Sequence, residues 1–189
     1  ITETNVPHGE NISYFGEGND EAQMVYNFAL PPLLAFSVLK SNTEKLTNWA
    51  KELALPGGGV CFFNFTASHD GIGVRAVNDI LDEKEMSFLV RTSIGHGGYA
   101  SYRAIGDEDE SPYELNCSYI DLLTHPEEDD NIRVKRMILS QAVVLAMPGV
   151  PGIYFHSLVG SRNYHEAVRK TRINRSINRD KLNYDNLKE

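Results

Sequence analysis

Two acidic residues and one histidine lie where they could take part in acid and base chemistry. Glu3 is close to the start of the sequence, and His69 and Asp70 come shortly after the apolar run at residues 60–65. Cleavage of a glycosidic bond needs one carboxyl group that protonates the leaving oxygen and negative charge near the oxocarbenium-like transition state. Glu3 and Asp70 are candidates for these two roles if the fold brings them to one cavity.

The same residues also have ordinary structural explanations. A glutamate near a chain start is commonly exposed and has no role, which is the alternative for Glu3. An aspartate after a strand often caps a helix or stabilises a turn, which is the alternative for Asp70. His156, at the end of another apolar run, is more typical of a hydrogen-bonded core or rim histidine than of a catalyst. Residue types alone leave both interpretations open.

Apolar runs and helical patterns alternate along the chain. Pro31 and Pro32 are expected to end the first strand, and Asn42 or Thr43 is expected to cap the second helix. The acidic run at residues 106–112 is typical of a solvated loop. We expect strands at residues 24–30, 60–65 and 150–160, and helices at residues 33–39, 44–53, 82–94 and 129–147.

This alternation predicts an α/β fold in which parallel strands are joined by right-handed crossovers. In open sheets and barrels of this kind, ligands bind at the carboxyl ends of the strands. We therefore expect a site where these ends meet. The polar residues expected at the strand ends are in residues 3–5, 26–27, 68–70 and 155–156.

Composition limits the classes of partner. The formal net charge of -8 over 189 residues argues against nucleic acid and anionic membranes, because phosphate binding requires clustered Lys and Arg. Cys61 and Cys117 are expected to be free thiols, without a spacing typical of zinc sites. No apolar run approaches ~18 residues, and no signal-peptide pattern opens the sequence. We expect a cytoplasmic protein that binds a neutral small molecule and has no metal site.

Four motifs, in their order along the chain, resemble segments of one known family. The motifs are "TETNVPH" at residues 2–8, "MVYNFALPPLL" at 24–34, "SHDGIG" at 68–73 and "MPGVPGIYF" at 147–155. Together they are similar to the second half of the catalytic barrel in the alpha-amylase superfamily (glycoside hydrolase family 13), in the branch that contains sucrose phosphorylase and glucosylglycerate phosphorylase. The resemblance runs over nearly the whole chain.

The resemblance implies a partial (β/α)8 TIM barrel that starts at the fifth strand. Residues 1–160 would form strands 5 to 8, with an inserted loop and helix region after strand 7. Residues 161–189 would form a polar active-site loop and the start of the final helical region. The N-terminal half of the barrel, with the nucleophilic aspartate of its fourth strand, would lie outside this chain. Because the nucleophile would be missing, we expect the isolated chain to be inactive. Because half a barrel leaves unpaired edges, we also expect the chain either to self-associate or to need the missing half.

The resemblance also assigns roles to individual residues. Glu3 matches the general acid/base of the family, and Asp70 matches the carboxylate that stabilises the transition state. His69 and Arg175 match residues that hold the glucosyl unit of the substrate. Tyr113 lies where the family places a tyrosine, on the loop that serves phosphate or the acceptor.

Two departures from sucrose phosphorylases concern the acceptor side. Asn5 and Glu114 stand where those enzymes carry a histidine and a glutamine, so they are expected to shape the acceptor site. This difference favours glucosylglycerate or a similar glucoside over sucrose. If the leaving group is an acid, an Arg or Lys must meet its carboxylate. The candidates, which the sequence does not rank, are Arg75, Arg103 and Arg162.

The activity implied by the resemblance is that of a glucoside phosphorylase. Such an enzyme transfers a glucosyl unit to inorganic phosphate with retention and gives α-glucose 1-phosphate, so phosphate is a co-substrate and no cofactor is expected. A hydrolase of the same superfamily and a non-catalytic carbohydrate-binding half-barrel are the alternatives. The joint presence of Glu3, His69, Asp70 and Arg175 favours an enzyme over a binding module.

Overall fold

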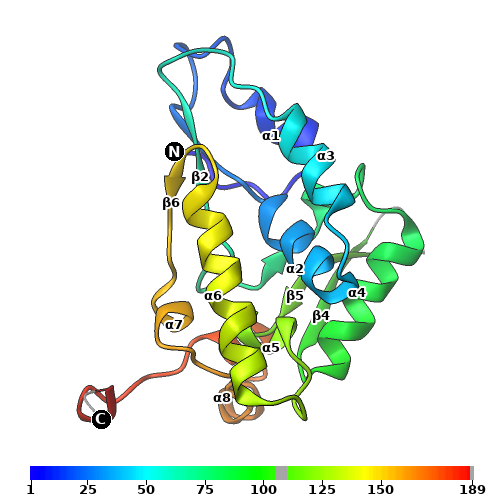
Figure 1. The fold of residues 1–189 in the computed structure, drawn as a ribbon, viewed down its shortest axis with the longest axis vertical. Helices are drawn as coiled ribbons and strands as arrows, with labels where there is room; N and C mark the ends of the chain where they lie inside the picture. The colour runs from blue at the N-terminus through cyan, green and yellow to red at the C-terminus, as the bar shows by residue number, and fades with distance from the viewer. Residues whose placement is uncertain (105–109, 188–189) are drawn as a thin grey trace.

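A computed structural model describes residues 1–104 and 110–187, and it contains two small sheets surrounded by helices (Figure 1). The two termini lie far apart along the long axis of the molecule (Figure 1). The elements in chain order are α1 (His8–Ser13), β1 (Met24–Tyr26), α2 (Leu30–Lys40), α3 (Glu44–Glu52), β2 (Cys61–Asn64), β3 (Ile72–Gly73), η1 (Arg75–Val77), α4 (Glu83–Gly95), β4 (Tyr99–Ala104), β5 (Glu110–Asn116), α5 (Tyr119–Leu123), α6 (Asp130–Ala146), β6 (Val150–Pro151), α7 (Phe155–Leu158), α8 (His165–Thr171), η2 (Asn174–Asn178) and η3 (Asp185–Leu187).

The first sheet is parallel and has the strand order β1–β2–β6. The register places Phe63 beside both Tyr26 and Val150. Thr2 forms an isolated parallel bridge to Val25, so the N-terminal segment runs alongside β1 in the same direction. This arrangement confirms the predicted α/β class with parallel strands. It also brings the residues after Thr2 and the residues after β2 to the same end of the sheet.

β1 is shorter than the predicted strand at residues 24–30, and the position of the two prolines explains the difference. Pro31 and Pro32 lie in the first turn of α2, which begins at Leu30, instead of ending a strand. Proline is tolerated there because the first N–H groups of a helix have no partner within the helix. The helix predicted at residues 33–39 is confirmed as part of α2.

The strand predicted at residues 150–160 is wrong beyond Pro151. β6 has two residues, and α7 occupies part of the remaining stretch. Pro151 has no N–H group to extend a ladder. The backbone of Gly152 approaches β2 so closely that an added Cβ would lie 2.2 Å from the ring of Phe63. The chain therefore leaves the sheet at a point where its apolar pattern still resembles a strand.

The region between β2 and β6 contains an antiparallel sheet, with the order β3–β5–β4, that the sequence did not predict. Residues 110–112 of the predicted acidic loop belong to β5, and residues 106–109 of that loop lie outside the described residues. The helix predicted at residues 82–94 is confirmed as α4. It begins with a capping box in which the side chains of Asp82 and Glu85 accept hydrogen bonds from each other's backbone N–H groups.

The helices predicted at residues 44–53 and 129–147 are confirmed as α3 and α6. The apolar residues of α6 do not all face the core. Ile138 is 63% exposed and Leu139 is 52% exposed, whereas Val144 is fully buried. α6 runs along the outside of the molecule, so much of its surface is not covered by the described residues (Figure 1).

The main core lies between α2, the second sheet, α4 and α5. Tyr119 is almost fully buried in this core, and its hydroxyl group donates a 2.8 Å hydrogen bond to the carbonyl oxygen of Pro31. Leu33 and Leu115 are also fully buried there. Among the helices of the described residues, none is both long enough and apolar enough to cross a membrane.

The two thiols are free and differ in their surroundings. Burial raises the pKa of Cys117 to about 12, although the hydroxyl of Ser93 donates to its sulfur, whereas Cys61 is only partly buried. Because the thiolate is the reactive form, we expect iodoacetamide at about pH 8 to modify Cys61 and to leave Cys117 unmodified. Peptide mass spectrometry measures the alkylation of each cysteine. Protein unfolded in urea is the control in which both cysteines react. Equal labelling of the folded protein would contradict the burial of Cys117.

Candidate active site

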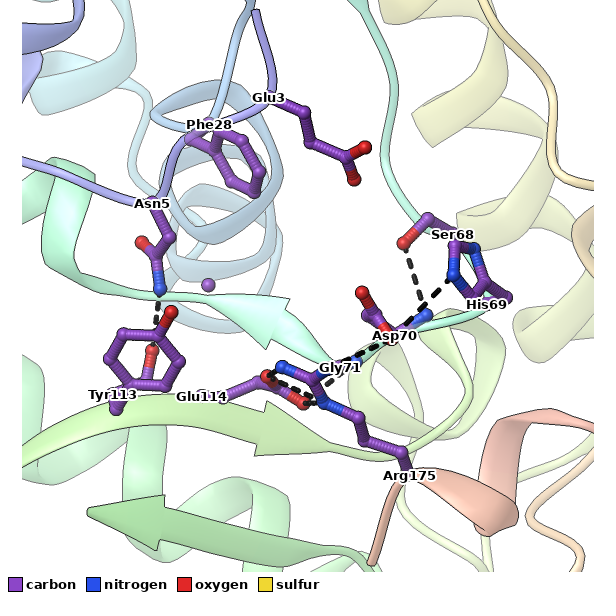
Figure 2. A pocket seen from close by; sticks show the side chains of 11 residues that line it. Glu3, Asn5, Phe28, Ser68, His69, Asp70, Gly71, Tyr113, Glu114 and Arg175 are labelled. Carbon is purple, nitrogen blue, oxygen red and sulfur yellow. Dashed lines mark hydrogen bonds and ion pairs between the residues drawn. The ribbon is translucent and has the colours of Figure 1, made fainter. Parts of the chain in front are cut away.

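A cavity of about 190 Å³ lies beside the end of β2, and all of the predicted site residues line it (Figure 2). The predicted meeting of residues 3–5 with residues 68–70 is therefore observed. His156 lies elsewhere, where its Nδ1 is 2.8 Å from the hydroxyl oxygen of Ser161. The residues that line the cavity are Glu3, Asn5, Phe28, Ser68, His69, Asp70, Gly71, Gly73, Tyr113, Glu114 and Arg175.

Asp70 is held by two arginines. Nη1 of Arg175 is 3.1 Å from Asp70 Oδ1, and Nη2 of Arg179 donates to the same oxygen at 2.7 Å. Nε of Arg179 also donates to the carbonyl oxygen of His69 at 2.6 Å. Two guanidinium groups on one carboxylate oxygen fix the orientation of the carboxylate. The His69 ring is largely exposed, with Nε2 3.8 Å from Asp70, so it can turn toward a ligand.

Glu114 is buried behind this pair and contacts Arg175 from the other side. Its side chain is only 4% exposed, and its carboxylate accepts from Nε of Arg175 at 3.0 Å and from Nη2 at 2.5 Å. Its Oε1 also accepts from the backbone N–H of Gly71 at 2.8 Å. The hydrogen bond to Glu114 raises the pKa of Arg175 above its already high value. Glu114 therefore positions Arg175 and, through Gly71, the backbone that carries Asp70.

Gly71 leaves no room for a side chain next to Glu114. An added Cβ would lie 2.3 Å from Glu114 Oε1. We expect Gly71→Ala to displace the carboxylate and cost about 1–3 kcal/mol in the free energy of unfolding, as overpacking typically does. The matched control is Gly95→Ala, since nothing lies within 4 Å of the Cβ position of Gly95. Equal effects of the two variants in thermal unfolding would contradict this contact.

Asn5 ties the N-terminal segment to β5. Its Nδ2 donates to the carbonyl oxygen of Tyr113 at 3.0 Å, and its Oδ1 is buried without a partner among residues 1–104 and 110–187. The backbone N–H of Val74 donates to the same Tyr113 oxygen at 3.1 Å. The bond from Asn5 therefore anchors the N-terminal segment to β5, two residues after Glu3. The Glu3 side chain extends into the cavity and faces the side where Asp70 lies (Figure 2).

The loop that holds Asp70 depends on two residues that the sequence analysis missed. Asn178 donates from Nδ2 to the carbonyl oxygen of Ser68 at 2.6 Å and to that of Asp70 at 3.1 Å. Arg179 is the second arginine on Asp70. Both belong to the second half of the repeat "RINRSINR" at residues 172–179. The repetition of Asn and Arg at a spacing of four was the available signal for them.

The arrangement can support acid and base chemistry on a neutral ligand. Glu3 and Asp70 face one cavity from two segments, and Arg175 supplies a positive charge between Asp70 and Glu114. Burial, followed by the charge of Glu3, raises the pKa of the Tyr26 hydroxyl, so Tyr26 stays neutral beside the site. Within the described part of the chain, no group of three or more His, Cys, Asp or Glu residues could hold a metal ion.

Known proteins with similar sequences share one kind of activity in their names. No family model matches the sequence. Glucosylglycerate phosphorylase of Escherichia coli (strain K12) is 48% identical over 181 residues, which are 96% of this chain and 32% of that protein. Sucrose phosphorylase of Agrobacterium vitis is 30% identical over 166 residues, which are 82% of this chain and 31% of that protein. The chain thus spans about a third of the length of the curated relatives it matches.

A solved structure supports the same relationship at the level of the fold. The crystal structure of sucrose 6F-phosphate phosphorylase from Thermoanaerobacter thermosaccharolyticum matches with a TM-score of 0.81. The match covers 98% of this chain and 35% of that chain, at 22% sequence identity. By sequence and by fold, this chain is a homologue of one segment, about a third in length, of the glucosylglycerate and sucrose phosphorylases.

Proposed function

We propose that this chain forms part of the active site of a glucoside phosphorylase that transfers a glucosyl unit to inorganic phosphate with retention. The observation that carries the proposal is the cavity in which Glu3 and Asp70 face each other and Arg175 is held by Glu114. The names of the relatives support glucosylglycerate as the first substrate to test, ahead of sucrose.

In this proposal the reaction has two steps. An aspartate outside these 189 residues attacks the anomeric carbon while Glu3 gives its proton to the departing glycosidic oxygen. A covalent glucosyl intermediate forms, and Asp70 stabilises the positive charge that develops on the sugar. An oxygen of phosphate then attacks the anomeric carbon, its proton passes to Glu3, and the nucleophilic carboxylate is released. His69 and Arg175 hold the glucosyl unit in both steps.

The proposal includes the architecture of the whole protein. The parallel order of the Thr2 segment, β1, β2 and β6 fits strands 5 to 8 of a (β/α)8 barrel, with residues 161–189 as a polar active-site loop and the start of a helical region. Further strands would then cover the open edges of this sheet, and the exposed face of α6 would be covered by the rest of the enzyme or, in the isolated chain, by self-association. Two free thiols fit a reducing compartment, and we place the enzyme in the cytoplasm.

A product assay on the whole enzyme tests the proposal. The enzyme is incubated with glucosylglycerate, sucrose or glucosylglycerol, with and without phosphate, and glucose 1-phosphate and free glucose are measured. We expect glucose 1-phosphate from glucosylglycerate, only when phosphate is present. Free glucose at equal rates with and without phosphate would identify a hydrolase instead. Binding of the sugar without any product would identify a non-catalytic module.

A further inference from the structure

A second small cavity, next to the candidate active site, contains two arginines. Its volume is about 190 Å³. Arg75 in η1 is half-buried, and Arg103 in β4 is exposed. Asn78 and Ser111 add an amide and a hydroxyl group to the same wall, so the side chains that line it offer several hydrogen-bond donors and no carboxylate among the described residues. Such a cavity fits a small anion.

Neither arginine has an ion pair or a side-chain hydrogen bond among residues 1–104 and 110–187, although the chain carries a net charge of -8. Two other arginines at the surface are paired. Arg162, the third candidate for binding an acid, is paired with the buried carboxylate of Asp121. Arg136 is paired with Glu128 at 2.7 Å. Two unpaired guanidinium groups that line one cavity therefore distinguish Arg75 and Arg103, and the structure removes Arg162 from the candidates.

The strand pairing places this cavity close to the first one. Tyr113 lines the first cavity, and Ser111, two residues away on β5, lines the second. On the paired side, Gly73 at the end of β3 lines the first cavity, and Arg75, at the start of η1 two residues later, lines the second. Two residues of a strand correspond to about 7 Å. Ser111 is also paired with Arg103 in the β4–β5 ladder. The two arginines thus lie beyond Tyr113, on the far side from Asp70.

We propose that Arg75 and Arg103 together bind one small oxyanion during catalysis, either the carboxylate of an acidic leaving group or inorganic phosphate. This inference rests on the proposed function. In a retaining double displacement the leaving group departs from, and phosphate arrives at, the same face of the sugar, because one acid/base residue serves both steps. The planar guanidinium group donates two parallel hydrogen bonds to either anion. A single anion site near that face therefore serves whichever molecule carries the charge.

The test compares KM values for charged and neutral acceptors in the whole enzyme. In the synthetic direction, glucose 1-phosphate is the donor, and glycerate or neutral glycerol is the acceptor. In the other direction, the KM for phosphate is measured. The variants are Arg75→Gln, Arg103→Gln and the double variant. The matched control is Arg169→Gln on α8, which removes the same charge from an exposed residue that lines neither cavity.

We expect each single variant to raise the KM for glycerate, for phosphate or for both at least tenfold, and to change the KM for glycerol less than twofold. An increase for both anions assigns the site to the two molecules in turn. A change confined to glycerate assigns the site to the leaving group, and a change confined to phosphate assigns it to the co-substrate. Unchanged KM values for both anions in the double variant would overturn the proposal. Arg103 is exposed, so its variant remains informative if Arg75→Gln fails to fold.

A failure of the proposed function is distinguishable from a failure of the anion site. If the wild-type enzyme shows no phosphorylase activity, calorimetry with glycerate alone and with phosphate alone still tests the site. Binding of either anion to the wild type that is lost in the double variant, and kept in Arg169→Gln, supports the site without the activity. No binding of either anion by the wild type overturns it.

Discussion

Replacement of Glu3 by Gln is expected to lower kcat/KM for the phosphorolysis of glucosylglycerate by about 10²–10⁴, the usual contribution of a general acid or base. The glycosidic oxygen of a sugar acid is a poor leaving group unless it is protonated as the bond breaks. Glutamine has almost the same size as glutamate and cannot supply that proton. The Glu3 side chain extends into the cavity, and among residues 1–104 and 110–187 it forms no ion pair or side-chain hydrogen bond, so we expect the substitution to leave the surrounding packing unchanged.

A second substrate, with a better leaving group, tests whether the loss of activity in Glu3→Gln is due to the missing proton. α-Glucosyl fluoride releases fluoride, which needs much less assistance from an acid. For this substrate we expect the first step in the Glu3→Gln variant to be within about tenfold of the wild type, because only the acid function is lost. A rapid-quench measurement of the first fluoride released isolates that step. An equal loss for both substrates would mean that Glu3 binds the substrate and is not the acid.

The matched control is Glu10→Gln on the exposed side of α1, which removes the same charge from the same N-terminal part of the chain. Its rates with both substrates should remain within twofold of the wild type. A large loss in this control would point to the overall charge of the N-terminal segment, and the specific role of Glu3 would then be contradicted.

The position of the site could be predicted from the sequence, because strand ends obey a general rule. The apolar run at residues 60–65 contains β2, and His69 and Asp70 come a few residues after it. The parallel order of the sheet then brings Glu3 to the same end. The individual roles of Glu3 and Asp70 came from the resemblance and remain predictions. The local sequence pattern was therefore sufficient to predict where the site lies, but not to predict the chemical role of each residue in it.

The support of the site could not be predicted in the same way. Glu114 stands in an unremarkable strand, and its burial against Arg175 depends on contacts between residues 61 positions apart. Arg179 contacts Asp70 across an even longer separation of 109 positions in the sequence. The β4–β5 pairing was missed because the acidic run next to it resembles a loop. Each of these features depends on long-range packing, which overrides local propensity.

Loss of the partner of Glu114 is expected to destabilise the folded protein. Arg175→Gln leaves the buried carboxylate of Glu114 with the backbone N–H of Gly71 as its remaining partner. Removal of one partner from a buried pair typically costs about 3–5 kcal/mol. Because the side chain of Arg175 is 40% exposed, water reduces the penalty, and we expect a loss of about 2–3 kcal/mol in the free energy of unfolding. The midpoint of urea unfolding of the whole enzyme measures it.

The double variant separates the cost of an unpaired charge from the loss of a contact. In Arg175→Gln with Glu114→Gln, no buried charge is left without a partner, so we expect most of the lost stability to return. Activity should not return, because Asp70 still lacks one of its two guanidinium partners and the sugar lacks Arg175. If the two single losses instead add in the double variant, the residues are not energetically coupled and Glu114 does not position Arg175.

An ion pair at the surface provides the control for these Arg175 and Glu114 variants. Lys170 and Glu166 form an exposed pair one helical turn apart on α8, and Lys170→Gln should leave the unfolding midpoint unchanged, because water screens such pairs. The contrast isolates the effect of burial, since both substitutions remove one positive charge from a paired cation. Recovery of stability without recovery of turnover in the double variant would show that the buried carboxylate is present to hold an arginine against the sugar, and that the fold itself does not require the charge.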